Sequence, residues 1–208
     1  MPPLIAVLDY EIGNLRSAQK ALQHVGADAR LTADAGLVRE AAAVVLPGVG
    51  AFGRCMEALR RTGLDALAHE AVERNVPFLG ICIGMQMLFE GSEESPGEPG
   101  LGILPGMIRL LPAGVKRPQM QWNLLERRGE PGLLKGVPDP AWAYFVHSYA
   151  ADTDDAIVTA GCDYGGPVVA AVEQGPVWAT QFHPEKSGRT GLAVLQAFVQ
   201  RASAQVEV

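Results

Sequence analysis

Short apolar runs alternate with longer helical patterns through the first half of the chain, and this alternation restricts the fold more than any other feature. Nearly uninterrupted apolar runs occupy residues 4–10, 41–48 and 76–82, and a weaker candidate strand lies at 28–32. Strands of this kind are typical of parallel sheets that are covered on both faces. Because the strands alternate with helices, we predict an α/β fold with an open, mostly parallel sheet and helices on both faces.

Helical patterns fill the intervals between these strands. The first runs from Asn14, a candidate N-cap, to Gly26, and its apolar residues fall on one stripe. Helical segments follow the strand at 41–48 and extend to about Glu73, with an interruption at Gly63, and a further helix is predicted over 84–91. Each helix therefore offers an apolar face with which to cover the sheet.

The second half of the sequence has a different texture. The acidic, Pro- and Gly-rich segment 92–100 is typical of a surface loop. Residues 157–183 form short strands divided by YGG and QGP turns, which predicts antiparallel strands in the C-terminal half. A last helix over 191–202 should close the core. With 208 residues and no internal repeat, we expect one domain spanning 1–208.

Composition excludes several functional classes. The net charge is −6 and no basic run occurs, so we expect no sequence-independent binding to nucleic acid and no attraction to an anionic membrane. The N-terminus has no signal-peptide pattern, and no apolar stretch reaches about 18 residues, so we expect a soluble, cytoplasmic protein. The three cysteines lack metal-type spacing, so neither a disulfide framework nor a metal site is predicted.

The segment GICIG at 80–84 has the pattern of a nucleophile elbow with cysteine in place of serine. A buried strand precedes Cys82 and a helix follows it, so the sulfur should lie at a helix N-terminus, which favours the thiolate. The alternative is a small buried hydrophobe, the commonest fate of a free cysteine. We assign that alternative to Cys55 and Cys162, which have no elbow around them, and we predict that Cys82 is the nucleophile.

A thiolate nucleophile needs a base, and the base needs a group that orients it. His183 ends the strand WATQFH, and Glu185 follows two positions later. Residues two apart in an extended segment point to the same side, so the carboxylate can hold the imidazole while the ring faces Cys82. The other histidines are in helical stretches or in the strand AYFVHSY, where ordinary structural roles are expected: His24, His69 and His147. Cys82, His183 and Glu185 are the predicted catalytic triad.

The tetrahedral oxyanion formed by such an attack needs backbone N–H donors. The PGVG segment at 47–50 follows a predicted strand, at the sheet edge where sites in such folds gather. We predict an oxyanion hole made by Val49 and Gly50 from this segment and by Ile83, which follows the nucleophile.

Taken together, GICIGMQ, PGVG and HPE resemble the class I glutamine amidotransferases, and the resemblance covers nearly the whole chain. It implies hydrolysis of glutamine through a cysteine thioester, with no cofactor and no metal. It also implies that the glutamine pocket is formed by Gly48, Gln86, His147, Ser148 and Tyr149. For Gln86 the alternative is an ordinary helical surface residue.

Longer strings, DYEIGNLRS, QMQWN, YFVHSY and HPEKSG, are similar to one branch of that family. In this branch the glutaminase is one subunit of a heterodimer, and its partner is a (β/α)8-barrel cyclase subunit that makes imidazole glycerol phosphate and AICAR in histidine biosynthesis. The resemblance implies that ammonia passes directly to the partner. Our own hypothesis is that the PGVG backbone flips between two orientations, so that the partner's ligand can switch the oxyanion hole on. The branch commonly has glycine where Glu11 and Gln121 stand.

Four residues are implied at the partner interface by this resemblance: Asn14, Trp122, Asn123 and Lys186. For Trp122 a core position is equally open, since tryptophan serves both roles. Other readings also stay open at this point. The synthase could be one that makes pyridoxal phosphate or aminodeoxychorismate, the chain could be a non-catalytic regulatory module of the same fold, or it could be a cysteine hydrolase of similar architecture.

Overall fold

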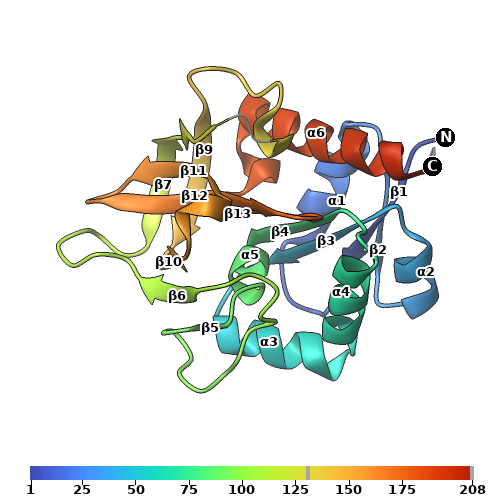
Figure 1. Ribbon diagram of the computed structural model, residues 1–208, viewed down its shortest axis with the longest axis horizontal. Coiled ribbons are helices and arrows are strands. Elements are labelled where there is room, and N and C mark those ends of the chain that lie inside the picture. The colour runs from blue at the N-terminus through green and yellow to red at the C-terminus, as the bar shows by residue number, and fades with distance from the viewer. Residues whose placement is uncertain (130–131, 207–208) are drawn as a thin grey trace.

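A sheet of eight strands forms the centre of the computed structural model, which describes residues 1–129 and 132–206 (Figure 1). The strand order is β2-β1-β3-β4-β13-β12-β11-β8. The first five are mutually parallel and the last three run antiparallel to their neighbours. Their bounds are β1 (Leu4–Leu8), β2 (Asp28–Thr32), β3 (Ala43–Gly48), β4 (Phe78–Cys82), β8 (Glu126–Arg127), β11 (Val158–Asp163), β12 (Pro167–Gln174) and β13 (Val177–Thr180). The predicted open, mostly parallel sheet with antiparallel strands in the C-terminal half is confirmed.

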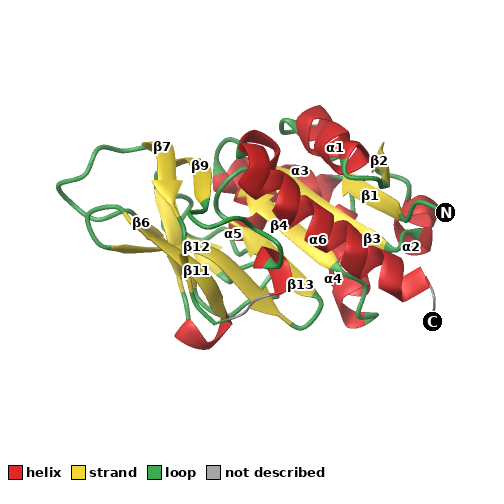
Figure 2. Ribbon diagram, turned by 90° about the horizontal axis from the view of Figure 1, so that it is seen from above, coloured by secondary structure: helices red, strands yellow, loops and turns green. Residues whose placement is uncertain are grey.

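Helices cover both faces of the parallel part of the sheet (Figures 1 and 2). The helices α1 and α6 pack together on one face, and α2, α3, α4 and α5 lie on the other. Their bounds are α1 (Leu15–His24), α2 (Ala35–Glu40), α3 (Phe52–Arg61), α4 (Leu64–Glu73), α5 (Ile83–Met87) and α6 (Gly188–Val206). Strands β1, β3 and β4 are almost completely buried as a result, which explains their uninterrupted apolar sequences.

Two smaller sheets adjoin the antiparallel end of the large sheet (Figure 2). One has the order β10-β6-β5, and the other pairs β7 with β9. Their bounds are β5 (Gly91–Ser92), β6 (Met107–Leu110), β7 (Gln119–Leu124), β9 (Trp142–His147) and β10 (Tyr149–Asp152), and three short 3₁₀ turns lie at Gly132–Leu134, Asp155–Ile157 and Pro184–Lys186. Among the described residues, no helix is long and apolar enough to cross a membrane.

The helix predicted over 84–91 is shorter than expected, because α5 ends at Met87. The segment 100–104 runs beside its end and takes the carbonyl groups that a longer helix would use. The N–H groups of Leu101 and Leu104 donate to Met87 and Leu88, at 2.8 and 2.9 Å. A competing tertiary contact therefore ends the helix, although the apolar pattern continues.

The first helix begins at the predicted position, but its capping differs from the prediction. Asn14 occupies the N-cap position and makes no side-chain bond to the helix backbone. Its side-chain oxygen instead accepts a hydrogen bond from the Ser17 hydroxyl, at 2.8 Å. The last helix is longer than the predicted 191–202, because it starts at Gly188, directly after the His183 turn.

Candidate active site

Cys82 is the last residue of β4 and the N-cap of α5, and its backbone has φ 55° and ψ −112°. A side chain other than glycine rarely adopts positive φ, and such strain is characteristic of nucleophile elbows. The bend brings the sulfur to the carboxyl end of the parallel sheet, where it lines a cavity although the residue is only 3% exposed. The elbow predicted from GICIG is therefore present in the structure.

The two glycines of this segment allow backbones to approach closely. A Cβ on Gly84 would overlap the carbonyl oxygen of Leu46 in the neighbouring strand. A Cβ on Gly80 would lie 2.8 Å from a methyl carbon of Leu88 and 3.0 Å from the Gly84 carbonyl oxygen. Side chains at these positions would push α5 away from β3 and β4, and the bend at Cys82 would change.

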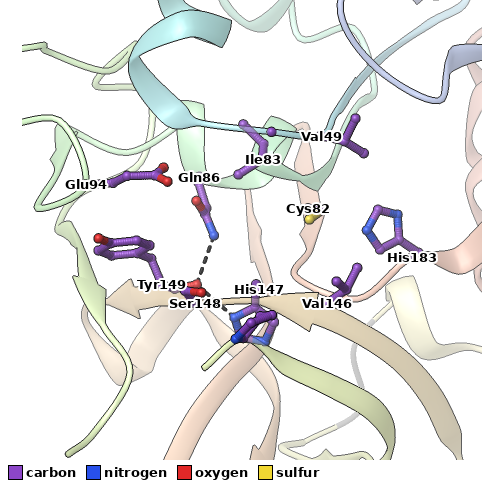
Figure 3. A pocket seen from close by; sticks show the side chains of 12 residues that line it. Val49, Cys82, Ile83, Gln86, Glu94, Val146, His147, Ser148, Tyr149 and His183 are labelled. Carbon is purple, nitrogen blue, oxygen red and sulfur yellow. Dashed lines mark hydrogen bonds between the residues drawn. The ribbon is translucent and has the colours of Figure 1, made fainter. Parts of the chain in front are cut away.

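His183 reaches Cys82 because β13 lies directly beside β4 in the sheet, although the two strands are about a hundred residues apart in sequence. The His183 backbone N–H donates to the Tyr144 carbonyl at 3.0 Å, and its carbonyl accepts from the Ser187 hydroxyl at 2.7 Å. These bonds fix the turn after β13. The imidazole points toward the Cys82 sulfur across the cavity (Figure 3).

The His183 ring is held between a carboxylate and the sulfur. Its Nδ1 bonds to Glu185 Oε1 at 2.8 Å, and both side chains are almost fully buried. Its Nε2 is buried, has no hydrogen-bond partner within the described part of the chain and faces Cys82 (Figure 3). Burial alone would lower the pKa of His183, but the hydrogen bonds and charges of Cys82 and Glu185 outweigh it and raise the pKa to about 9. The arrangement therefore favours a charged imidazolium next to the Cys82 sulfur.

The PGVG segment lies beside the sulfur because β3 and β4 pair with Gly48 opposite Cys82. Val49, Gly50 and Ile83 all line the cavity, as the prediction of an oxyanion hole requires. The Val49 carbonyl accepts a hydrogen bond from the Cys55 thiol, at 3.5 Å. Rotation of the peptide between Val49 and Gly50 would break this bond, so Cys55 constrains the loop that carries two of the predicted donors.

Gly48 itself lies behind the cavity and not in its lining. A Cβ at this position would meet the Tyr10 hydroxyl at 2.7 Å and the Gly84 nitrogen at 2.9 Å. The Tyr10 hydroxyl donates to the Pro47 carbonyl at 2.7 Å. Gly48 therefore permits close packing beneath the loop, which differs from the predicted place in the glutamine pocket.

The cavity has a volume of about 240 Å³. It brings together residues from the loop after β3, the elbow, β9, β10 and the turn after β13 (Figure 3). Its lining consists of Val49, Gly50, Cys82, Ile83, Gln86, Glu94, Pro118, Val146, His147, Ser148, Tyr149 and His183. All the residues predicted for the triad, the oxyanion hole and the glutamine pocket therefore meet here, except that Gly48 and Glu185 lie one layer behind.

Gln86 is 1% exposed and is not a surface residue. Its Nε2 donates both to the Tyr149 carbonyl at 2.9 Å and to Gln181 Oε1 at 3.0 Å, while its own Oε1 has no partner among residues 1–129 and 132–206. His147 Nδ1 also bonds to the Tyr149 carbonyl, at 2.8 Å, and burial lowers the pKa of this histidine to about 4. His147 is therefore neutral near pH 7 and serves to fix the cavity wall.

Sequence reasoning missed two polar residues of the site. Gln181 is fully buried and donates to the Cys82 sulfur at 3.8 Å. Glu94 lines the cavity, and its Oε2 accepts from the Phe52 N–H at the start of α3, at 2.8 Å. The polar Gln181 among apolar neighbours in WATQFH was a usable signal. Glu94 had none, because its loop reads as solvent-exposed.

The predicted interface residues all lie at or near the surface. Asn14 and Lys186 are exposed. Trp122 is 49% exposed on β7, which removes the alternative of a core position. Asn123 is partly exposed, and its side-chain nitrogen donates to the Asp163 carbonyl at 2.8 Å. Their exposure is compatible with a partner surface.

The two departures from the branch pattern are also exposed. Glu11 has φ 71°, which explains why glycine suits this position, and its carboxylate pairs with Arg61 at 2.6 Å. Gln121 lies on β7 between Met120 and Trp122. Neither residue lines the cavity that contains Cys82 and His183.

The fold and this geometry together define an α/β enzyme class in which a cysteine at a strand-to-helix elbow faces a histidine and a glutamate. The family model for glutamine amidotransferase class-I matches residues 6–202. The chain belongs to this family and is a glutamine amidotransferase.

Curated relatives agree with this assignment, and solved structures agree with the fold. The chain is 48% identical over 202 residues to "Imidazole glycerol phosphate synthase subunit HisH" of Deinococcus radiodurans, with 94% of this chain and 93% of the relative covered. It is 47% identical to the protein of the same name from Methanothermobacter thermautotrophicus, with 95% and 98% covered. A crystal structure of a glutamine amidotransferase matches with a TM-score of 0.76 at 22% identity, over 96% of this chain and 98% of that one. PurLQS from Thermotoga maritima matches with a TM-score of 0.74 at 19% identity, over 96% and 99%. These two structures support the fold.

Proposed function

We propose that this chain is the glutaminase subunit of an imidazole glycerol phosphate synthase, and that it passes ammonia to a cyclase subunit in histidine biosynthesis. The observation that carries the proposal is the buried set of Cys82, His183 and Glu185 at the edge of one cavity. The name shared by relatives at 47–48% identity over nearly their whole length supports the choice of synthase. We further propose that residues 1–208 act as one domain, in the cytoplasm.

The reaction begins when the Cys82 thiolate attacks the side-chain amide carbon of glutamine. The C–N bond then breaks, and His183 gives its proton to the departing nitrogen. Ammonia is released, and the glutamyl group remains attached to Cys82 as a thioester. Neutral His183 next takes a proton from water, the hydroxide attacks the thioester, and glutamate leaves as the thiolate returns. Glu185 keeps Nδ1 protonated through both steps because it accepts the hydrogen bond from that atom.

The rest of the cavity has the polar groups that glutamine requires. The N–H groups of Val49, Gly50 and Ile83 are the candidate donors for the oxyanion. The Glu94 carboxylate and the unpartnered Gln86 Oε1 can accept hydrogen bonds from the substrate ammonium. Backbone groups of Ser148 and Tyr149 form the opposite wall, which His147 holds in place through the Tyr149 carbonyl. The partner's ligand would activate hydrolysis by reorienting the PGVG backbone.

An exposed apolar face on β7 and β9 is the proposed docking surface for the cyclase. Met120, Trp122 and Leu124 alternate along β7, so their side chains share one face, and Trp142 pairs with Leu124 on it. On the same face Val146 pairs with Met120 and lines the cavity. The apolar face therefore adjoins the place where ammonia is released, and a partner seated there would shield ammonia from water. Asn14, Asn123 and Lys186 would extend the contact.

The test measures glutamate release from glutamine by the purified chain, alone and with the cyclase subunit of an imidazole glycerol phosphate synthase. We expect the complex with cyclase ligand bound to be faster than the free chain, and Cys82→Ser to be inactive in both. Trp122→Ala should weaken the complex by about ten- to a hundredfold, in keeping with an interfacial tryptophan. Equal rates with and without the cyclase and its ligand, together with no binding, would refute the assignment to this synthase.

A further inference from the structure

We propose that Gln181 is a positioning residue that holds the Cys82 sulfur and the Gln86 side chain in their reactive places. Gln181 is fully buried directly after β13, two residues before His183. Its backbone N–H donates to the Ala170 carbonyl at 2.8 Å, which anchors it to β12. A polar side chain buried so completely needs partners at both ends of its amide, and both of its partners belong to the site.

The hydrogen-bond network fixes which end of the Gln181 amide faces the sulfur. The Tyr149 carbonyl can only accept, so the group of Gln86 that contacts it at 2.9 Å must be its NH₂. The same NH₂ contacts Gln181 at 3.0 Å, and the atom that receives it must be the Gln181 oxygen. The Gln181 NH₂ therefore points the other way, toward Cys82, whose sulfur it contacts at 3.8 Å.

An N–H aimed at the sulfur favours the charged form of that sulfur. It supports the thiolate before attack, and again when the thiolate leaves as the thioester is hydrolysed. The Gln181 oxygen has a second role, because it accepts the hydrogen bond that holds Gln86, whose own Oε1 has no partner among the described residues and can face the substrate. One side chain therefore sets the position of both the nucleophile and a residue of the substrate pocket.

The same chain contains a natural control for this contact. Gln119 is also fully buried, and its Nε2 donates to the sulfur of Cys162 at 3.9 Å. Neither Gln119 nor Cys162 lines the cavity. Gln119 pairs with His147 in the β7–β9 ladder, but its own side chain lies outside the cavity lining. Gln119→Met therefore removes the same kind of group from the same kind of contact without replacing a residue of the cavity.

The first experiment measures the rate at which iodoacetamide alkylates Cys82 as a function of pH, with the modified peptide identified by mass spectrometry. Two variants divide the role of Gln181. Gln181→Met removes both the donor and the acceptor, and Gln181→Glu keeps an acceptor for Gln86 and removes the donor to sulfur. We expect the pH midpoint of alkylation to move upward by about one unit in Gln181→Met. In Gln181→Glu it should move further, because the added negative charge opposes the thiolate. Gln119→Met should keep the wild-type midpoint.

The second experiment separates the two ends of the amide by steady-state glutaminase kinetics in the complex with the cyclase. We expect Gln181→Glu to lower kcat about tenfold, the size of one hydrogen bond to a charged group, with KM near the wild-type value. Gln181→Met should lower kcat similarly and also raise KM, because Gln86 is released. Gln119→Met should leave both constants unchanged. A role confined to packing would lower the melting temperature of the variants and leave the alkylation midpoint unmoved.

The inference rests on the proposed function, but the alkylation measurement requires no turnover of glutamine. If the chain lacked glutaminase activity and the midpoint still moved, the contact between Gln181 and Cys82 would stand while the proposed function failed. Wild-type midpoints in both Gln181 variants would overturn the inference, whatever the activity. If Gln181→Met does not fold, the isosteric Gln181→Glu decides the question.

Discussion

Two buried cysteines in this molecule have closely similar surroundings and opposite expected reactivity. Cys82 and Cys162 are both free, are 3% and 1% exposed, and each receives a hydrogen bond from a fully buried glutamine. Cys82 ends a strand at φ 55° and lines a cavity, whereas Cys162 lies inside β11 and pairs with Val168 in the regular part of the β11–β12 ladder. Burial and a donor to sulfur therefore do not by themselves make a nucleophile.

The difference lies in what else faces each sulfur. Burial raises the pKa of the Cys162 thiol to about 11, so it stays neutral near pH 7. Cys82 instead faces the Nε2 of His183 (Figure 3). Cys82 and Glu185 together raise the pKa of this histidine. The bend at the end of β4 and the imidazole from the neighbouring strand distinguish a reactive sulfur from an inert one.

Replacement of each sulfur by oxygen tests this contrast with the largest expected effect. Cys82→Ser should lose glutaminase activity by more than about three orders of magnitude, because loss of a nucleophile disables the whole set. Cys162→Ser should retain activity within about twofold per folded molecule. The measurement is glutamate release in the complex. Comparable losses in the two variants would mean that Cys82 has no special role.

Removal of the carboxylate behind His183 should have a smaller effect. Glu185→Gln keeps the shape of the side chain but no longer favours the protonated Nδ1, so the ring can take the wrong tautomer. We expect kcat to fall roughly 100-fold, less than the ~10⁴-fold seen when a triad carboxylate is lost in serine proteases, with little change in KM. Steady-state kinetics against glutamine check this. An unchanged kcat would show that Glu185 has no orienting role.

The glycines beside the two cysteines should differ in their tolerance of a methyl group. Gly84→Ala places a carbon in the Leu46 carbonyl and should lower the free energy of unfolding by about 2–4 kcal/mol. Gly161→Ala, next to Cys162, brings its Cβ only to 3.3 Å from the Val168 carbonyl, and its cost should stay below about 1 kcal/mol. Urea denaturation of both variants measures the difference, and equal costs would contradict it.

The features that the sequence could predict are those that have a local signature. The buried strands β1, β3 and β4, the elbow at Cys82 and the meeting of His183 with Glu185 all have local signatures in apolar runs, glycine spacing and alternation. The end of α5 at Met87 does not, because it depends on a segment that returns from 100–104 to take the carbonyl groups.

Contacts that join distant segments account for the other misses in the site. From the sequence alone, Gln181 is only a polar residue in a predicted strand, and its role emerges from the pairing of β13 with β4. The acidic loop with Glu94 has the composition of a solvent-exposed segment, but in the fold the Glu94 carboxylate accepts a hydrogen bond from the first turn of α3. The family resemblance implies a place for Gly48 in the substrate pocket, whereas the packing of Tyr10 and Gly84 against it gives it a structural role.

The smallest predicted effect is a difference in how His183, beside Cys82, and Cys162 change the free energy of unfolding as the pH rises. The pKa of His183 is raised in the folded chain to about 9, above its ordinary value of 6.5. A group of this kind contributes stability that is fully present below pH 6.5 and is lost as the pH rises to 9. The pKa of Cys162 is raised from 9 to about 11, so its contribution is lost only between pH 9 and 11. The two windows do not overlap.

Denaturation of wild type and His183→Asn at several pH values should therefore show a gap in unfolding free energy that narrows between pH 6.5 and 9. Its change should be on the order of 1–2 kcal/mol, since each pKa unit corresponds to about 1.4 kcal/mol and the two partners of the pair share the effect. The gap between wild type and Cys162→Ala should stay constant over this range and change only above pH 9. A gap for His183→Asn that is flat from pH 6.5 to 9 would show that the imidazole is not charged by its pairing with Cys82 and Glu185. The contrast between the two sulfurs would then depend on backbone position alone.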